Sequence, residues 1–408
     1  MTSLSFLLWL VYNRWVYRAS EFFTQLSKRN DMRNLLFVLT CAFIAMPAMA
    51  VEIDLGVASN YNAFIKKNFK VTSSDTQGRI AVGGNLVVNG GYDIGYRIDE
   101  FGMGSGPSLV VGGNIVKKGQ GHFNVYEDGP HQSPHSGDVL YAGSVTDKKG
   151  RIEANLIQTD KANLPVNFND AFAHLNQLSQ DLAAATAHGV GVKDGWPLVF
   201  KPTTTPDNNV YVFNVTQEQI NSTNEWNIEG VSADATVVFN VTNPNKVAGK
   251  SNYNGNECAQ GAKSCVHLSQ TNIKINGELL SEHYQKGFLN NNFKQQVLFN
   301  FAGATQVNLA TDLYASVLAP KADIKANPSV IWGQVIGKSW QGNMQINYSP
   351  FTPVDGGTTP VPTPTSLWIF ALAIALVYVN RRTINKRMIK LKNKKLKAQL
   401  HKDAAVSC

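Results

Sequence analysis

Two groups of residues in this chain carry side chains that could bind a metal or form a covalent link. The first group gathers imidazole and carboxylate side chains in one Gly- and Pro-rich stretch: His122, Asp128, His131 and His135. Such side chains are common metal ligands. Pro134 excludes a simple helical arrangement of them, and histidines in loops are more often solvated. We therefore predict no metal and no cofactor, and keep these four residues only as candidates.

The second group is a pair of cysteines, Cys258 and Cys265, with six residues between them. A zinc site that also used His267 would have only three nearby ligands, whereas structural zinc takes four. The spacing does not fit a Cys-x-x-Cys redox pair either. In an exported chain the usual outcome is a disulfide, which would stabilise the fold by about 2–3 kcal/mol for so small a loop.

The chain lacks the motifs that mark common enzyme sites. Gly102–Gly106 has no Gly-Lys-Ser/Thr ending, and neither Gly-x-Ser-x-Gly nor His-Glu-x-x-His occurs. We therefore predict no catalytic residues and no enzyme. A polysaccharide-active enzyme stays open as an alternative, because paired carboxylates can come from distant turns of a β-helix. Asp93, Asp99 and Glu100 do not stand out in the sequence as such a pair.

A repeat in the sequence indicates which secondary-structure elements would position these residues. Arg79–Val88 returns as Ser108–Lys117 with the Gly-Gly-Asn cores 29 residues apart, and a fainter copy covers Asp138–Val145. Each copy is a β-branched run broken by small residues, which is typical of a strand, a tight corner and a strand. Because Gly adopts positive φ at little cost and Asn tolerates it, we assign structural turns to Gly83, Gly84, Asn85, Gly112, Gly113 and Asn114.

A unit that turns a corner and recurs at a near-constant period predicts a stacked coil of strands. The alternative is two unrelated hairpins with similar turns. We favour the coil, because the flanking apolar pattern repeats along with the turn. The predicted fold class is therefore mainly β: a β-solenoid with one long helix packed along its side, plus a C-terminal transmembrane helix.

The long helix is predicted from Asn167 to His188. Its apolar positions recur at a spacing near 3.6 residues and form one stripe: Phe168, Phe172, Leu175, Leu178 or Ser179, Leu182 and Ala185. Asn167 or Asn169 can cap its start, and Gly189 can end it. Later strands are predicted at 210–214, 236–240, 297–301, 314–318, 330–336 and 344–348.

Residues 32–50 have the parts of a secretory signal peptide: a basic start at Arg33, an apolar run, and a small-x-small site at Ala48 and Ala50. We expect cleavage after Ala50. Residues 1–31 then form an upstream extension, explained by a mis-assigned start with Met32 as the initiator. The body is predicted to be one domain over 51–351.

The composition changes beyond the body. Residues 352–365 form a Pro- and Thr-rich linker, 366–380 an apolar segment, and 381–408 a basic tail. The apolar run is short, since a span needs about 20 residues. The linker before it and the stop formed by Arg381 and Arg382 favour a transmembrane segment with a cytoplasmic tail.

The formal net charge of +8 comes from the ends of the chain. The tail carries ten Lys or Arg residues and one Asp, whereas residues 51–380 have a net charge of −4. The body therefore gives no reason to propose nucleic acid as a partner.

Several segments of the body resemble the choice-of-anchor A family: Gly78–Asn85, the predicted helix, Val297–Phe301, Ser316–Asp323 and Gly333–Ser339. The resemblance covers about 53–351. It implies an exported, adhesin-like bacterial protein with a β-helical body, varied C-terminal anchors and no established catalytic residues.

The C-terminus resembles a PEP-CTERM sorting signal, whose box here is Val361, Pro362, Thr363 and Pro364. This resemblance implies processing by an exosortase. Thr363 stands where that signal usually has Glu, and the basic tail is longer than usual, so a retained membrane anchor is the alternative. A looser similarity links the order of elements to bacterial ice-binding solenoids, although regular Thr-x-Thr rows are missing.

These observations predict an exported protein, anchored in the membrane or at the cell surface, with its body on the periplasmic or extracellular side. The expected function is that of an adhesin or a biofilm matrix protein. A flat solenoid face, with rows of side chains about 4.8 Å apart, would bind a polysaccharide or a repetitive protein surface. The alternatives are a polysaccharide-active enzyme and, third, an ice-binding protein.

Overall fold

The computed structural model describes most of the chain between residues 52 and 353. The described ranges are 52–98, 106–127, 136–206, 208–242, 264–268, 272–282 and 296–353, with positions 389, 390 and 393. The chain divides into two compact units, of which Ala50–Gly357, the body, contains nearly all of these residues.

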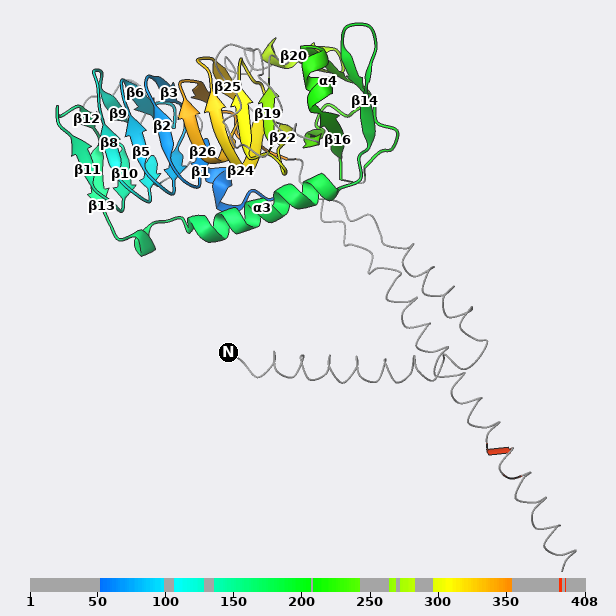
Figure 1. Ribbon diagram of the computed structural model, residues 1–408, viewed down its shortest axis with the longest axis horizontal. Coiled ribbons are helices and arrows are strands. Elements are labelled where there is room, and N and C mark those ends of the chain that lie inside the picture. The colour runs from blue at the N-terminus through cyan, green and yellow to red at the C-terminus, as the bar shows by residue number, and fades with distance from the viewer. Residues whose placement is uncertain are drawn as a thin grey trace, which may run out of the picture. The chain divides into compact units, whose positions relative to one another are not determined.

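The body is a stack of coils in which the backbone passes through three strand positions in each turn (Figure 1). Each strand pairs in parallel with its counterparts in the neighbouring coils, so the three positions form three faces. Face A runs through β13 (Asn155–Gln158), β10 (Asp138–Tyr141), β7 (Leu109–Val111), β4 (Ile80–Val82), β1 (Ala63–Ile65), the first parts of β26 (Val335–Gly342) and β24 (Ser316–Ala326), β22 (Val297–Asn300), β18 (Thr236–Thr242), β16 (Val210–Thr216) and β14 (Gly189–Lys193).

Face B follows face A around the first corner of each coil. It runs through β11 (Val145–Asp147), β8 (Ile115–Lys117), β5 (Leu86–Val88), β2 (Phe69–Val71), the second parts of β26 and β24, β23 (Gln306–Leu309) and β19 (Cys265–Leu268).

Face C closes each turn. It runs through β12 (Ile152–Glu153), β9 (Phe123–Val125), β6 (Tyr92–Ile94), β3 (Ser74–Thr76), β27 (Gln345–Asn347) and β25 (Val330–Trp332). Toward the β14 end, the same position in the coil is taken by β20 (Asn272–Ile275), β17 (Glu225–Ile228) and β15 (Leu198–Phe200), with β21 (Glu278–Leu279) antiparallel to β20.

The chain enters this stack in its middle. β1 pairs with β4 on one side and with β26, close to the end of the body, on the other. The first half winds outward from β1 to β13. The chain then crosses to the opposite end, and the second half winds back from β14 until β27 pairs with β3. Strand pairing thus joins the two halves into one solenoid.

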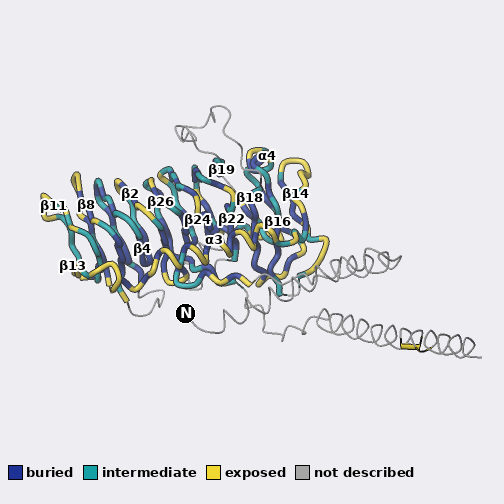
Figure 2. The backbone as a smooth tube through the Cα atoms, turned by 60° about the horizontal axis from the view of Figure 1, so that its bottom comes forward, coloured by how far each residue is buried: buried dark blue, intermediate teal, exposed yellow. Residues whose placement is uncertain are grey.

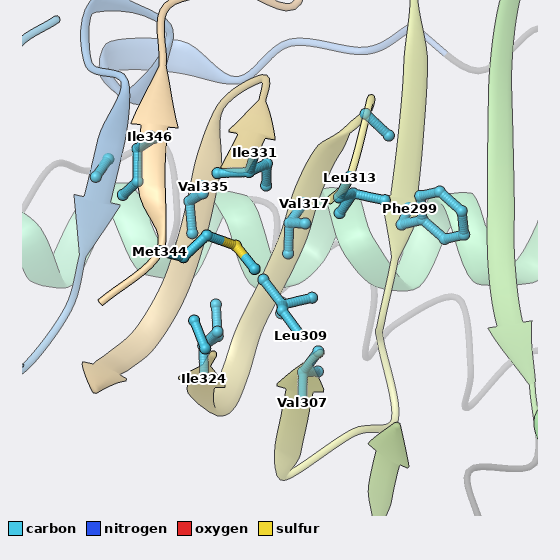
Figure 3. Close-up of a cluster of buried hydrophobic side chains, with 14 of the residues drawn as sticks. Phe299, Val307, Leu309, Leu313, Val317, Ile324, Ile331, Val335, Met344 and Ile346 are labelled. Carbon is cyan, nitrogen blue, oxygen red and sulfur yellow. The ribbon is translucent and has the colours of Figure 1, made fainter. Parts of the chain in front are cut away.

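The inside of the coil is one continuous apolar core. Alternate residues of the strands point into it, as the β pleat requires. Figure 3 shows part of this core, where Phe299, Val317, Ile324, Val335 and Met344 from successive coils lie against one another. Aromatic rings fill the second half, with Phe239 5.1 Å from Trp226 and 5.2 Å from Phe299 between ring centroids.

The predicted helix is confirmed as α3 (Phe168–Ala184), which crosses face A from one half to the other (Figure 1). The Oδ1 atom of Asn167 accepts hydrogen bonds from the N–H groups of Asn169 and Asp170, which caps the helix as expected. The buried stripe is the predicted one: Phe168, Phe172, Leu175, Leu178, Ser179 and Leu182. The helix ends at Ala184, and Gly189, the predicted end, instead begins β14.

The stripe of α3 forms a second apolar core with the outward side chains of face A. Phe64 stacks on both Phe168 and Phe172, and Ala81, Val110, Leu298 and Leu318 lie in the same cluster. A short 3₁₀ helix, η1 (Gly56–Asn60), adds Ala58 to it. The middle of face A is therefore covered and both of its sides are buried there, whereas β13 at one end and Val190 of β14 at the other are exposed.

The Gly-Gly-Asn segments lie at the corners between faces A and B, from β4 to β5 and from β7 to β8, but positive φ is not the reason for their glycines. Gly83, Gly84, Gly112 and Gly113 are absent from the positive-φ residues of the described chain. They are needed because neighbouring corners touch. A Cβ atom on Gly83 would lie 2.3 Å from the carbonyl oxygen of Lys66, and one on Gly112 would lie 2.5 Å from that of Gly83.

The predicted transmembrane helix is not supported. Among the helices in the described part of the chain, none is long and apolar enough to cross a membrane. The segment 366–380 itself lies outside the described residues, as do the signal peptide, the linker and nearly all of the tail.

Candidate surface-binding site

Face B is the strand face whose outward side chains form the longest in-register rows without a helix over them. The central row takes one residue from each coil, in the order Thr146, Val116, Val87, Lys70, Gln341, Lys325, Asn308 and His267. Strand pairing places consecutive members about 4.8 Å apart. The row is exposed or half-buried from Thr146 to Lys325 and becomes buried at Asn308.

A second row runs along the corner between faces A and B. The backbone N–H of Asn85 donates to Asn68 Oδ1 at 2.9 Å, and that of Asn114 donates to Asn85 Oδ1 at 2.8 Å. The N–H of Ser144 continues the ladder to Asn114 Oδ1 at 2.8 Å. Each Asn oxygen thus fixes the next coil, while the amide nitrogens of these Asn side chains are not engaged by that ladder.

The two rows together define an uncharged patch on the first half of face B. The patch consists of Asn85, Val87, Asn114, Val116, Ser144 and Thr146. Charge returns toward the seam between the halves, at Lys70, and beyond it, where Lys338 Nζ lies 2.7 Å from Asp323 Oδ2. The patch offers apolar and amide groups in repeating order and has no group suited to acid–base chemistry.

Face C is also uncovered in part, but its outward row is acidic. In register across successive coils lie Glu153, Asn124, Asp93, Asp75 and Gln345. Asn124 Nδ2 donates to Asp93 Oδ1 at 2.8 Å, and His122 Nδ1 lies 2.7 Å from Glu153 Oε1. The sequence did not reveal that Asp75 and Asp93 are neighbours, because only the stacking of β3 on β6 brings them together.

The pKa of Asp75 is perturbed on this face. Burial raises it to about 6, and the nearby charge of Asp93 adds to the rise, while hydrogen bonds from Tyr96 and Gln345 oppose it. Burial likewise raises the pKa of Tyr96 to about 12. Asp75, Asp93 and Tyr96 thus interact electrostatically on this face. In the described part of the chain no group of three or more His, Cys, Asp or Glu residues could hold a metal ion.

The residues predicted as a metal site are only partly described. His122 precedes β9 and pairs with Glu153, a residue the sequence did not connect with it. Asp128, His131 and His135 lie outside the described residues, so the structure does not bring the four together.

The predicted disulfide is described at one end only. Cys265 begins β19, is buried, and is disulfide-bonded. Cys258 lies outside the described residues, and its pairing with Cys265 stays a prediction. The cleavage site at Ala48 and Ala50, the sorting box Val361–Pro364 and the stop at Arg381 and Arg382 lie outside them too.

One family model matches most of the body. It is described as "Putative Ice-binding-like adhesive domain" and matches residues 54–348. This match supports the resemblance at the level of an adhesive domain, and choice-of-anchor A and PEP-CTERM are not shown by it. No protein with curated annotation matches the chain.

Solved structures with weak similarity are ice-binding proteins. One from the Antarctic ascomycete Antarctomyces psychrotrophicus is 14% identical, with 75% of this chain and 99% of that chain covered and a TM-score of 0.29. A glycosylated one from an Arctic yeast is 12% identical, with 75% and 98% covered and a TM-score of 0.30. A domain from Shewanella frigidimarina is 10% identical, with 74% and 99% covered and a TM-score of 0.29. TM-scores of this size carry no argument, and the fold rests on the strand ladders.

The family match corrects the main functional prediction. An anchored adhesin for polysaccharide or repetitive protein surfaces is wrong as the leading function, because the matching family is ice-binding-like. The match favours the third alternative instead. Its description is that of an adhesive domain and not of an enzyme.

Proposed function

We propose that this chain, which belongs to the ice-binding-like adhesive domain family, binds ice through face B. The observation that carries this proposal is the unbroken register of face B, where the same backbone position recurs in every coil from β11 to β23. A crystal surface is periodic, so a periodic protein face can make one kind of contact many times. Many weak contacts then add up without any deep pocket.

Face B suits such a surface better than the other two faces. Most outward side chains of face A are buried under α3. Face C carries Asp75, Asp93 and Glu153 in its outward row, and carboxylates hold water strongly. On face B the uncharged patch combines Val87 and Val116, which are easily dehydrated, with amides that can hydrogen-bond to ordered water.

The fixed corner adds rigidity to the uncharged patch. Because the Asn68–Asn85–Asn114–Ser144 ladder sets the position of each coil relative to the next, the side chains beside it do not need to be ordered on binding. Pre-organisation of this kind lowers the entropic cost of association. The patch is therefore the part of face B assigned to ice contact.

The experiment is a charge substitution in the centre of the patch. Val116→Lys places an ammonium group between Val87 and Thr146, and its hydration opposes contact with ice. We expect a several-fold loss of partitioning into slowly grown ice and of ice recrystallisation inhibition. Val330→Lys is the matched control, because Val330 is also a half-buried outward valine of a strand, but on face C.

Two results would contradict the proposal that face B binds ice. One is a wild-type protein that is excluded from growing ice as fully as an unrelated protein of the same size. The other is equal loss in both variants, because face B would then have no special role. Thermal unfolding of each variant checks that the body is still folded.

The predicted signal peptide lies outside the described residues, so the compartment of the protein is a proposal as well. We propose export through the signal peptide at 32–50 with cleavage after Ala50, which places an adhesive domain outside the cytoplasm. Intact-mass measurement of the fractionated protein tests this: a mature chain that still begins at residue 1 contradicts it. The same mass reports whether residues 352–408 are retained.

A further inference from the structure

The two ends of the solenoid differ in whether their last strands are covered. At the β14 end, face B is closed by α4 (Gln217–Ser222), whose first residue acts as a substitute strand. Gln217 Nε2 donates to the carbonyl oxygen of His267 at 2.9 Å, and Gln217 Oε1 accepts from the N–H of His267 at 3.0 Å. On face A, β14 leaves the parallel ladder after Val190 and pairs antiparallel with β15.

The opposite end has no such closure in the described part of the chain. There β11, β12 and β13 each pair on one side only, with β8, β9 and β10. The N–H groups of Asn155 and Thr159 donate to carbonyl oxygens of the β10 coil, at Gly137 and Tyr141. Since N–H directions alternate along a strand, those of Leu156 and Gln158 point away from β10, toward the open edge.

The interior of the coil is also open at this end. Leu156 pairs in register with Val139 of the preceding coil, so both side chains point into the interior. Leu156 is nevertheless 38% exposed, whereas Val139 is 0% exposed. In the same way Val145 and Ile152 are half-buried, whereas their neighbours Ile115 and Phe123 are fully buried. Figure 2 shows this end, at β11 and β13, as a run of exposed and half-buried backbone.

The open edge lacks the usual protection of an edge strand. Monomeric proteins usually protect an edge strand from pairing with another chain by charged residues, Pro or a bulge. β13 has the sequence Asn155-Leu-Ile-Gln158, with no charge, no Pro and an unbroken register to β10, and all four residues are exposed. An uncapped solenoid end needs a cover for its last apolar layer. A covering strand would satisfy both the backbone and the interior side chains.

We propose that this end binds the same end of a second copy of the chain, with the two β13 strands antiparallel about a two-fold axis. Two copies present identical open edges, and a two-fold contact between identical surfaces closes on itself. Stacking of one end on the other would instead form a fibre, and it is disfavoured because α4 and the β14–β15 hairpin close the far end.

The backbone geometry of the edge agrees with an antiparallel contact. In antiparallel pairing centred on Ile157, Leu156 of each copy lies opposite Gln158 of the other, so the outward N–H and C=O groups of both residues pair across the two-fold axis. A two-fold axis normal to face A also exchanges the other faces, so the two copies present face B on different sides of the dimer.

Sedimentation velocity of the full chain over a range of concentrations tests this proposal. The wild-type protein is expected to be a dimer. Leu156→Lys is expected to be a monomer, because each copy would bury a lysine against the other core. Val192→Lys is the matched control: Val192 is an exposed strand valine at the closed end and should remain dimeric.

A second variant tests strand pairing itself. Leu156→Pro removes an N–H that points to the open edge without removing a hydrogen bond to β10, and Pro is tolerated on such an edge. It should also be monomeric with an unchanged far-ultraviolet circular dichroism spectrum. A monomeric wild type, a dimer that survives both variants, or an assembly that grows without limit with concentration would overturn the proposal.

Discussion

Single residues in this protein serve mainly to stack one coil on another. Gly113 is an example, because a Cβ atom there would lie 2.4 Å from Asn85 Oδ1 and 2.8 Å from the carbonyl oxygen of Gly84. Both atoms are fixed, one by the Asn ladder and the other by the backbone. The chemistry of the Gly-Gly-Asn turn is therefore close approach plus one side-chain hydrogen bond per coil, and at Gly113 there is no room for a Cβ.

The first prediction concerns this close approach. Gly113→Ala should lower the free energy of unfolding by about 1–3 kcal/mol, the usual range for overpacking. Gly91→Ala is the control, since a Cβ there would meet nothing closer than 3.7 Å and Gly91 does not have positive φ. Urea unfolding measures both. Equal stability of the two variants would show that the corners can separate at little cost.

The second prediction concerns Asp75. Its folded pKa of about 6 lies above the ordinary Asp value of 3.8, so the folded state takes up a proton first as the pH falls. As the pH falls from about 6 to about 4, the contribution of Asp75 to the free energy of unfolding should therefore rise by about 2–3 kcal/mol. Above pH 6 that contribution should be lowest. Asp75→Asn should be more stable than wild type at pH 8 and should lack this rise.

Unfolding at a series of pH values measures the effect, with Asp181→Asn as the control. Asp181 is an exposed carboxylate on α3 that accepts a hydrogen bond from Gln177, so its substitution reports the effect of replacing a surface Asp by Asn. If Asp75→Asn keeps the wild-type profile, another group causes the dependence.

At the scale of elements, the main feature is the way α3 is fixed to face A. Asparagines lie in register on β18 and β22 beneath the helix. Asn240 Nδ2 donates to the carbonyl oxygen of Leu182 at 2.6 Å, and Asn300 Nδ2 donates to that of Ser179 at 2.8 Å. These hydrogen bonds thus fix the position of α3 along face A, because apolar contacts are not directional.

The third prediction follows from this arrangement. Asn300→Ala should cost about 1–3 kcal/mol, because it leaves the hydroxyl and carbonyl groups of Ser179 buried without that partner. Thermal unfolding measures the loss. Asn272→Ala, at an exposed strand position, should change stability by less than about 0.5 kcal/mol. A neutral Asn300→Ala would mean that the apolar stripe holds the helix without help.

At the scale of the whole molecule, the two halves of the chain are joined by both a seam and a bridge. The seam is the pairing of β26 with β1 and β2, and the bridge is α3, which touches residues from both halves. Solenoids with only neighbour contacts can unfold in parts. Here the continuous core and the helix should make the body unfold as one unit.

The fourth prediction tests this cooperativity. In the body, every tryptophan lies in the second half, at positions 196, 226, 332 and 340. Phe123→Ala in the first half, at a fully buried site, should cost about 3–5 kcal/mol. It should lower the unfolding midpoint seen by tryptophan fluorescence of the unit 50–357 as much as that seen by circular dichroism. Separate midpoints would mean that the halves unfold independently.

The sequence by itself determined the parts that depend on a few neighbouring residues. The corners at Gly83–Asn85 and Gly112–Asn114, the helix with its Asn167 cap, and the turn length of 18 residues from Val317 to Val335 were all readable, because turn chemistry and apolar periodicity are local. The ends of elements were less certain, since the helix stops at Ala184, where Ala185 takes an extended backbone conformation, and Gly189 begins β14.

Only the tertiary structure decided which coil lies next to which. The pairing of β1 with β26, the rows of face B and the contact of Asp75 with Asp93 join residues far apart in the chain or separated by loops of unequal length. Their neighbours are chosen by the burial of one shared core, which no local pattern records. The same burial leaves face B uncovered and the β13 end open, and these two surfaces carry the proposed functions.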